Sequence, residues 1–117
     1  MTVVETFLSV DVDDMDRATA FYVAALGAEI AFATPRWTSL RVAGVRLGLF
    51  ANPGHPRGRI GLHFVVDDLA ATGAAIARAG GAVLTASTEV APGVVTSDVC
   101  DTEGNAFSLR QANQQGT

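Results

Sequence analysis

The sequence predicts an α+β fold in which two βαβββ modules form curved mixed sheets around a concave cavity, with the helices on the convex side. Two observations lead to this prediction. The first is an internal repeat, because Leu8-Ser-Val-Asp-Val-Asp-Asp-Met15 returns 54 positions later as Leu62-His-Phe-Val-Val-Asp-Asp-Leu69. The second is the order of hydrophobic patterns in each copy: an alternating strand, a helical stripe, and then three shorter strands.

The repeat continues to the end of each copy. The same shift sets Gly27 on Gly81, and the closing segments Leu47-Gly-Leu49 and Phe107-Ser-Leu109 match at a shift of 60 positions. The longer second shift indicates longer loops in the second copy. We therefore expect one domain over residues 1–117, made of repeats at about 3–52 and 58–112 joined by a Pro- and Gly-rich loop at 52–58.

The elements of the first copy follow from local patterns. Leu8, Val10 and Val12 alternate with more polar residues, which indicates a strand with one apolar face. Asp14 is suited to cap the following helix, and Gly27 to end it. Three strands are expected after the helix, near residues 29–34, 37–43 and 45–51.

The second copy repeats this order. Leu62, Phe64 and Val66 form the apolar side of its first strand, Asp68 is the expected helix cap, and Gly80-Gly81 ends the helix. Three strands are again expected, near residues 82–85, 93–100 and 105–111.

Composition excludes several classes of protein. The chain has 117 residues, 49% hydrophobic and 17% charged, which is typical of a globular domain with a packed core. A formal net charge of −4 argues against nucleic-acid binding, which usually needs a basic surplus. No apolar run approaches the roughly 20 residues of a membrane span, and Glu5 does not suit a signal peptide. We therefore expect a cytoplasmic protein that binds neither nucleic acid nor membranes.

The second face of each predicted sheet is neither a core nor an ordinary solvated surface. Its mixture of aromatic, small and polar side chains suits the wall of a ligand cavity. The residues of this face are Phe7, Ser9, Arg46, Gly48, Phe50, Gly61, His63, Ser108 and Arg110.

Three motifs give the chain a specific resemblance. They are the paired βαβββ units, the first helix with Phe21-Tyr22 and Leu26-Gly27, and the closing Asp101-Thr-Glu-Gly-Asn-Ala-Phe-Ser-Leu109. Together they resemble the vicinal oxygen chelate superfamily, which contains glyoxalase I, bleomycin and fosfomycin resistance proteins, and extradiol dioxygenases. The resemblance covers about residues 4–111. The usual closing pattern is Asp-Pro-Asp-Gly-Asn, and Thr102-Glu103 replaces its middle pair.

The resemblance implies four positions at which enzymes of the superfamily hold a divalent metal with His and Glu. They fall on the opening and closing strands, at Phe7, Gly48, Gly61 and Ser108. Phenylalanine and glycine carry no side-chain donor, and a lone serine hydroxyl is a poor one. Catalytic zinc or iron typically needs about three protein ligands. We therefore expect no metal of the family type and no cofactor.

Without the metal, the resemblance favours the bleomycin-resistance branch, a metal-free cup that sequesters a drug or natural product. The expected partners are a hydrophobic or aromatic small molecule and a second copy of the chain, because that branch commonly forms homodimers with cavities at the subunit interface. Antibiotic resistance is the corresponding role. No catalytic residue is expected, and the expected ligand-binding residues are Phe7, Ser9, Trp37, Arg41, Phe50, His63, Ser108 and Arg110.

Two other functions stay open. One is an enzyme of the same fold that uses His63 and Glu5, or a rearranged metal site. The other is a degenerate scaffold whose cavity is filled by aromatic side chains, namely Phe7, Trp37 and Phe50.

Single residues also have plain structural interpretations. His63 can equally be a cavity wall, and Trp37 can equally fill a dimer interface. His55 is expected to be solvated. Cys100, the single cysteine, excludes an internal disulfide and is expected to be a small buried side chain.

Overall fold

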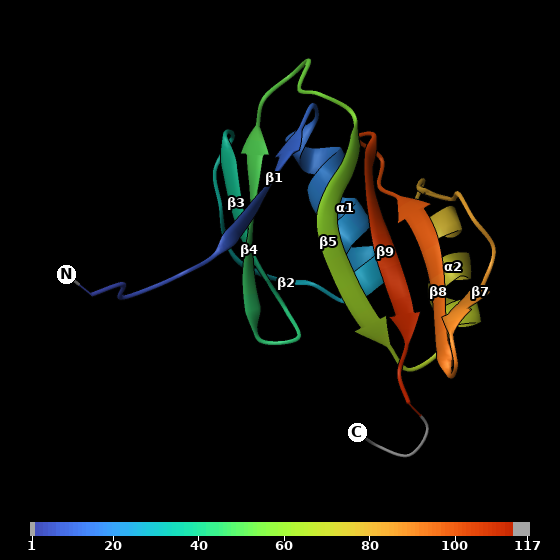
Figure 1. The fold of residues 1–117 in the computed structure, drawn as a ribbon. Coiled ribbons are helices and arrows are strands. Elements are labelled where there is room, and N and C mark those ends of the chain that lie inside the picture. The colour runs from blue at the N-terminus through green and yellow to red at the C-terminus, as the bar shows by residue number, and fades with distance from the viewer. Residues whose placement is uncertain (1, 114–117) are drawn as a thin grey trace.

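The computed structural model describes residues 2–113, which form two helices and nine strands in two mixed sheets (Figure 1). The first half contains β1 (Leu8–Val12), α1 (Met15–Leu26), β2 (Glu29–Ala33), β3 (Trp37–Val42) and β4 (Val45–Ala51). The second half contains β5 (Gly58–Val66), α2 (Leu69–Arg78), β6 (Ala82–Val83), β7 (Thr88–Ala91), β8 (Val94–Cys100) and β9 (Asn105–Gln111). The predicted fold class is confirmed.

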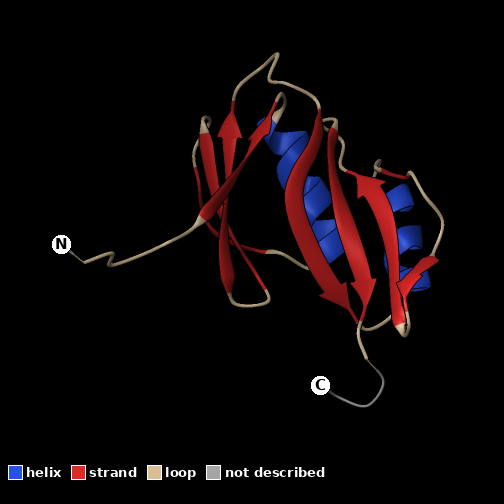
Figure 2. Cartoon of the chain, viewed as in Figure 1, coloured by secondary structure: helices blue, strands red, loops and turns tan. Residues whose placement is uncertain are grey.

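The two sheets share one topology. Sheet A has the strand order β1-β4-β3-β2, and sheet B has the order β5-β9-β8-β6 with β7 added beside β8. In each sheet the opening strand lies parallel to the closing strand, and the other pairs are antiparallel. Both helices lie behind sheet B in the view of Figure 2, and α1 also packs on β3 and β4 of sheet A. Within residues 2–113, neither helix is long and apolar enough to cross a membrane.

The helices begin where the sequence predicts. The Asp14 carboxylate accepts a hydrogen bond from the Arg17 backbone N–H at 3.0 Å, and the Asp68 carboxylate accepts one from the Ala71 N–H at 2.9 Å. Gly27 has φ of 66°, a left-handed conformation that glycine adopts without strain, and its N–H donates back to the last turn of α1.

Three features of the second half differ from the expectation. β7 is an additional strand, and β6 is shorter than expected because the backbone N–H groups of Leu84 and Thr85 both donate to the Asp98 carbonyl. β5 begins at Gly58, before the repeated motif, and carries an irregularity between Arg59 and His63. This irregularity matters for the site described below.

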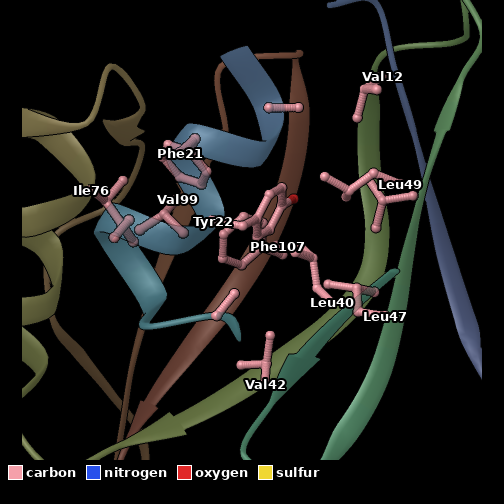
Figure 3. Close-up of a cluster of buried hydrophobic side chains, with 14 of the residues drawn as sticks. Val12, Phe21, Tyr22, Leu40, Val42, Leu47, Leu49, Ile76, Val99 and Phe107 are labelled. Atoms are coloured by element: carbon pink, nitrogen blue, oxygen red, sulfur yellow. The ribbon is translucent and has the colours of Figure 1, made fainter. Parts of the chain in front are cut away.

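Helix α1 lies between the two sheets and is the centre of the core. Phe21 and Tyr22 are both buried, and the Tyr22 ring stacks on Phe107 of β9 with centroids 6.4 Å apart. On the other side of the helix, Leu40 and Leu49 of sheet A are fully buried (Figure 3). The apolar faces of both sheets therefore converge on the helix, and the opposite faces are turned outward.

A buried polar turn between β8 and β9 connects the two halves. The Asp101 carboxylate accepts hydrogen bonds from the Tyr22 hydroxyl at 2.7 Å and from the Glu103 and Asn105 backbone N–H groups. Burial raises the pKa of Tyr22 well above its usual value, and the neighbouring Asp101 carboxylate raises it further. Tyr22 is therefore a neutral donor in the core.

Glu103 in the same turn anchors the start of α1. Its buried carboxylate accepts hydrogen bonds from the backbone N–H groups of Asp13 and Asp14, both at 2.9 Å, and pairs with Arg17 Nε at 2.8 Å. Burial acts to raise the pKa of Glu103, but the hydrogen bonds from Arg17, Thr102 and Asp14 outweigh it and lower the pKa to about 2. Glu103 is therefore an ionised link between the halves of the chain.

Candidate functional site

The outer face of sheet A carries three aromatic side chains in contact, which we call the aromatic row: Phe7, Trp37 and Phe50. Trp37 lies opposite Phe50 in the register of β3 and β4, and their ring centroids are 6.4 Å apart. The Phe7 ring meets Trp37 edge-on, with centroids 5.9 Å apart. Phe7 is 44% exposed and Phe50 is 37% exposed, so the row forms an apolar surface that is still open.

Gly48 of β4 makes this arrangement possible. A Cβ atom built on Gly48 would collide with the six-membered ring of Trp37. The indole therefore lies over the glycine backbone, where the side chain of any other residue at position 48 would project. Position 48 is one of the four at which the family resemblance places a metal ligand, so Trp37 covers that position.

Arg46 stands at the end of the aromatic row. Its Nη1 pairs with the Glu5 carboxylate at 2.7 Å, and its Nε donates to the Ser39 hydroxyl at 3.3 Å. Its Cζ lies 4.6 Å from the centroid of the Phe7 ring, which is a cation–π contact. The face thus combines an aromatic surface with one oriented cation.

The outer face of sheet B carries a polar cluster instead. Arg59 Nη2 donates to the Ser108 hydroxyl at 2.8 Å, and its Nη1 lies 3.3 Å from the Asp98 carboxylate. The Ser108 hydroxyl donates to the same carboxylate at 2.8 Å. The hydrogen bond from Ser108 is the main cause of the lowered pKa of Asp98, with a further contribution from Arg59.

Sequence reasoning missed the role of Arg59 because it assumed a regular strand. Between Arg59 and His63, β5 advances four residues while β9 advances two, from Ala106 to Ser108. Gly61 in this irregularity has φ of 70°, which favours glycine. Both Arg59 and His63 then share the face of Ser108. A glycine inside a strand pattern was the available signal, because it often marks a bulge.

The remaining site candidates are spread over the surface. His63 is exposed and lines an apolar groove of about 310 Å³ together with Leu8 and Leu47. Ser9 lines a different, more polar depression of about 510 Å³ between β1 and the start of β5. Arg41 and Arg110 are both exposed. The structure therefore brings together Phe7, Trp37 and Phe50 of the predicted set, and places His63, Ser108 and Arg110 on the other sheet.

The structure also bears on three other expectations from the sequence. His55 was expected to be solvated, and this is wrong: its side chain is 1% exposed, because the loop folds the ring against the Asp13 carboxylate and the Asn52 carbonyl. Glu5 and His63, the two residues named for the enzyme alternative, do not meet, since Glu5 contacts Arg46 of sheet A. Cys100 was expected to be buried and is only half-buried at the end of β8.

These features define the class of protein. Two βαβββ sheets of equal topology, with helices packed on one side, form a vicinal oxygen chelate fold. A family model described as a glyoxalase-like domain matches residues 7–110, and the chain belongs to that family.

Comparison with solved structures agrees with this fold. The bleomycin resistance determinant encoded on the transposon Tn5 is 22% identical, with a TM-score of 0.71 over 95% of this chain and 99% of that one. The fosfomycin resistance protein FosX from Listeria monocytogenes is 15% identical, with a TM-score of 0.80 over 98% and 96%. A lactoylglutathione lyase from Agrobacterium tumefaciens is 16% identical, with a TM-score of 0.74 over 95% and 96%. A comparison with curated proteins found no match.

One structure of FosX is a complex with Mn(II) and a sulfate ion, so we tested whether this chain has residues that fit a metal. They do not fit at the four family positions. Phe7 has no donor atom, Gly48 and Gly61 have no side chain, and the hydroxyl of Ser108 is held between its arginine and aspartate neighbours. Elsewhere in residues 2–113, no three His, Cys, Asp or Glu side chains are grouped to hold a metal ion.

Proposed function

We propose that the protein binds a hydrophobic or aromatic small molecule, such as a drug or natural product, without using a metal. The observation that carries this proposal is the aromatic row, in which the Trp37 indole covers the metal-ligand position Gly48 and the Phe7 ring stands beside it. Phe7 and Gly48, the two metal-ligand positions of the first half, are therefore parts of an apolar surface.

This surface contributes to the binding free energy of an aromatic ligand in two ways. Covering the exposed parts of Phe7 and Phe50 removes apolar area from water, at roughly 25 cal/mol per Å². Aromatic pairs in offset or edge-to-face geometry add about 0.5 to 1.5 kcal/mol beyond that burial. A planar guest satisfies both conditions better than an aliphatic guest of the same size.

The enzyme alternative has weaker support. FosX and lactoylglutathione lyase are named as a resistance protein and a lyase, but the part of the chain that the structure describes has no group of side chains suited to hold a metal. Glu5 lies before β1 and pairs with Arg46 of sheet A, whereas His63 belongs to β5 of sheet B, so the two do not form an acid–base pair. The scaffold alternative is disfavoured because the aromatic row is partly exposed and so still presents a surface to a ligand.

The binding site is proposed to be completed by a second copy of the chain. The inner faces of both sheets pack on one core around α1, and the aromatic row on the outer face of sheet A is left partly exposed. Large apolar side chains are also exposed near the β1 and β5 edges, including Leu8, Val45 and Val65, which is 64% exposed. We expect light scattering to give the mass of two chains. A monomer at micromolar concentration would contradict this part of the proposal.

The proposed function is tested by the fluorescence of Trp37, because it is the only tryptophan in the chain. A screen of planar aromatic natural products is expected to find compounds that saturably quench or shift its emission. Trp37→Leu should weaken the best of them about tenfold or more in calorimetry, since the stacking surface is lost. Phe64→Leu is the matched control, because Phe64 packs on Phe107 and away from the aromatic row. Equal losses in both variants would place the ligand elsewhere.

A further inference from the structure

We propose that the outer face of sheet A binds an aromatic carboxylate, and that the carboxylate of the ligand replaces Glu5 on the Arg46 guanidinium. This inference rests on the proposed binding function and names the chemistry of the ligand. The aromatic row ends at the Arg46 guanidinium, whose orientation is fixed by its neighbours.

The strand that carries Arg46 and two contacts of its side chain orient that cation. Arg46 belongs to the central strand β4, its Nε is held by the Ser39 hydroxyl, and its Cζ lies 4.6 Å from the Phe7 ring centroid. The remaining edge of the guanidinium, at Nη1, meets Glu5 at 2.7 Å. A carboxylate on an aromatic ring stacked along Phe7 and Trp37 would reach the same edge.

Glu5 is suited to be displaced. It lies on the arm formed by residues 2–7, which precedes β1 and has no helical or strand structure, and its side chain is 58% exposed. Within residues 2–113 its carboxylate pairs with Arg46 alone. Exposed ion pairs contribute little to stability, so exchanging one carboxylate for another costs little.

Two other arginines of these faces, Arg59 and Arg41, have carboxylates of neighbouring strands beside them. Arg59 pairs with Asp98, and this carboxylate belongs to strand β8 and is also held by the Ser108 hydroxyl. Arg41 has Glu29 opposite it in the register of β2 and β3. Arg46 is therefore the arginine beside the aromatic row whose carboxylate comes from outside the sheet.

Desolvation favours an acid over a neutral guest. A planar ligand on Phe7 and Trp37 excludes water from Arg46, and a guanidinium that loses water needs a carboxylate or another acceptor in its place. A ligand carboxylate supplies that acceptor in charge-assisted, bidentate geometry. A neutral aromatic amide of the same shape lacks the charge and competes poorly with Glu5.

The test compares 2-naphthoate with 2-naphthamide, which share a ring system and differ in charge. Binding is followed by the indole N–H resonance of Trp37 in nitrogen–proton correlation spectra, and affinity is measured by calorimetry. The wild-type chain is expected to bind naphthoate about tenfold more tightly than naphthamide, because the naphthoate carboxylate makes one charge-assisted hydrogen bond that the amide lacks. Arg46→Gln should remove this preference. Glu5→Gln should strengthen naphthoate binding several-fold and leave naphthamide binding unchanged, whereas Glu29→Gln, the matched control on β2, should change neither.

The outcomes separate the two proposals. If both probes shift the Trp37 resonance with equal affinity, and Arg46→Gln and Glu5→Gln alter neither, the carboxylate inference is overturned while the aromatic site stands. If neither probe shifts the resonance, and the Trp37 fluorescence screen also yields no ligand, the proposed function fails and the inference fails with it. Arg46 and Glu5 are both partly exposed, so neither substitution is expected to prevent folding.

Discussion

Glu103→Gln is expected to lower the free energy of unfolding at pH 7 by about 2 to 3 kcal/mol. The side chain of Glu103 is fully buried, and its carboxylate connects the turn before β9 to the first residues of α1. Glutamine keeps the size but loses the charge, so Arg17 and the two backbone N–H groups face a weaker acceptor. Chemical denaturation measures the loss, and Glu29→Gln on the exposed strand β2 is the control, expected to stay within about 0.5 kcal/mol of wild type.

The pH dependence of the same variant follows from the pKa of Glu103. The folded value of about 2 lies below the ordinary value of 4.5, so the charged carboxylate stabilises the folded chain fully above pH 4.5. That contribution is lost as the pH falls from 4.5 towards 2. The wild type should therefore lose its advantage over Glu103→Gln in this window. A constant difference between the two proteins from pH 7 to pH 2 would show that Glu103 is not an ionised anchor.

Gly48→Ala is expected to lower the free energy of unfolding by about 1 to 3 kcal/mol, because the added Cβ collides with the Trp37 ring. The backbone of Gly48 is not in a left-handed conformation, so alanine is strained here by the indole and not by φ. In a Trp37→Leu background the same substitution should cost less than about 0.5 kcal/mol or be slightly stabilising. Chemical denaturation of the wild type, the two single variants and the double variant isolates the interaction between Gly48 and Trp37.

The emission of Trp37 gives a second measurement on Gly48→Ala. Displacement of the indole from the sheet should shift its emission towards that of exposed tryptophan. An equal cost of Gly48→Ala with and without the indole, together with unchanged emission, would mean that Trp37 does not lie over the glycine.

The sequence was sufficient to predict the elements because their signals are local. Asp14, Asp68 and Gly27 act within one helical turn of their own positions, and the alternating strands of the repeat show which face is apolar. The short strand β7 was missed because Thr88–Ala91 is exposed throughout and lacks an apolar face. Leu8 shares the apolar side of its strand with Val10, yet it is half exposed at the start of the strand, where it lines the groove beside Leu47.

The site was predictable only in part because its contacts join distant residues. The aromatic character of Phe7, Trp37 and Phe50 was visible in the sequence, but the position of the indole over Gly48 depends on the pairing of β3 with β4. The Arg46–Glu5 pair joins residues 41 positions apart, and the burial of His55 depends on a carboxylate 42 positions before it. Periodicity and propensity carry no information on such contacts.

The central claim concerns four positions, Phe7, Gly48, Gly61 and Ser108, whose side chains offer no adequate set of donors to a cation. The most direct measurement is elemental analysis by mass spectrometry, after the protein has been incubated with excess Mn(II), Zn(II), Ni(II) or Fe(II) and then separated by gel filtration. We expect well below one ion of any of these metals per chain. One tightly retained ion per chain, accompanied by a change in Trp37 emission, would contradict the account.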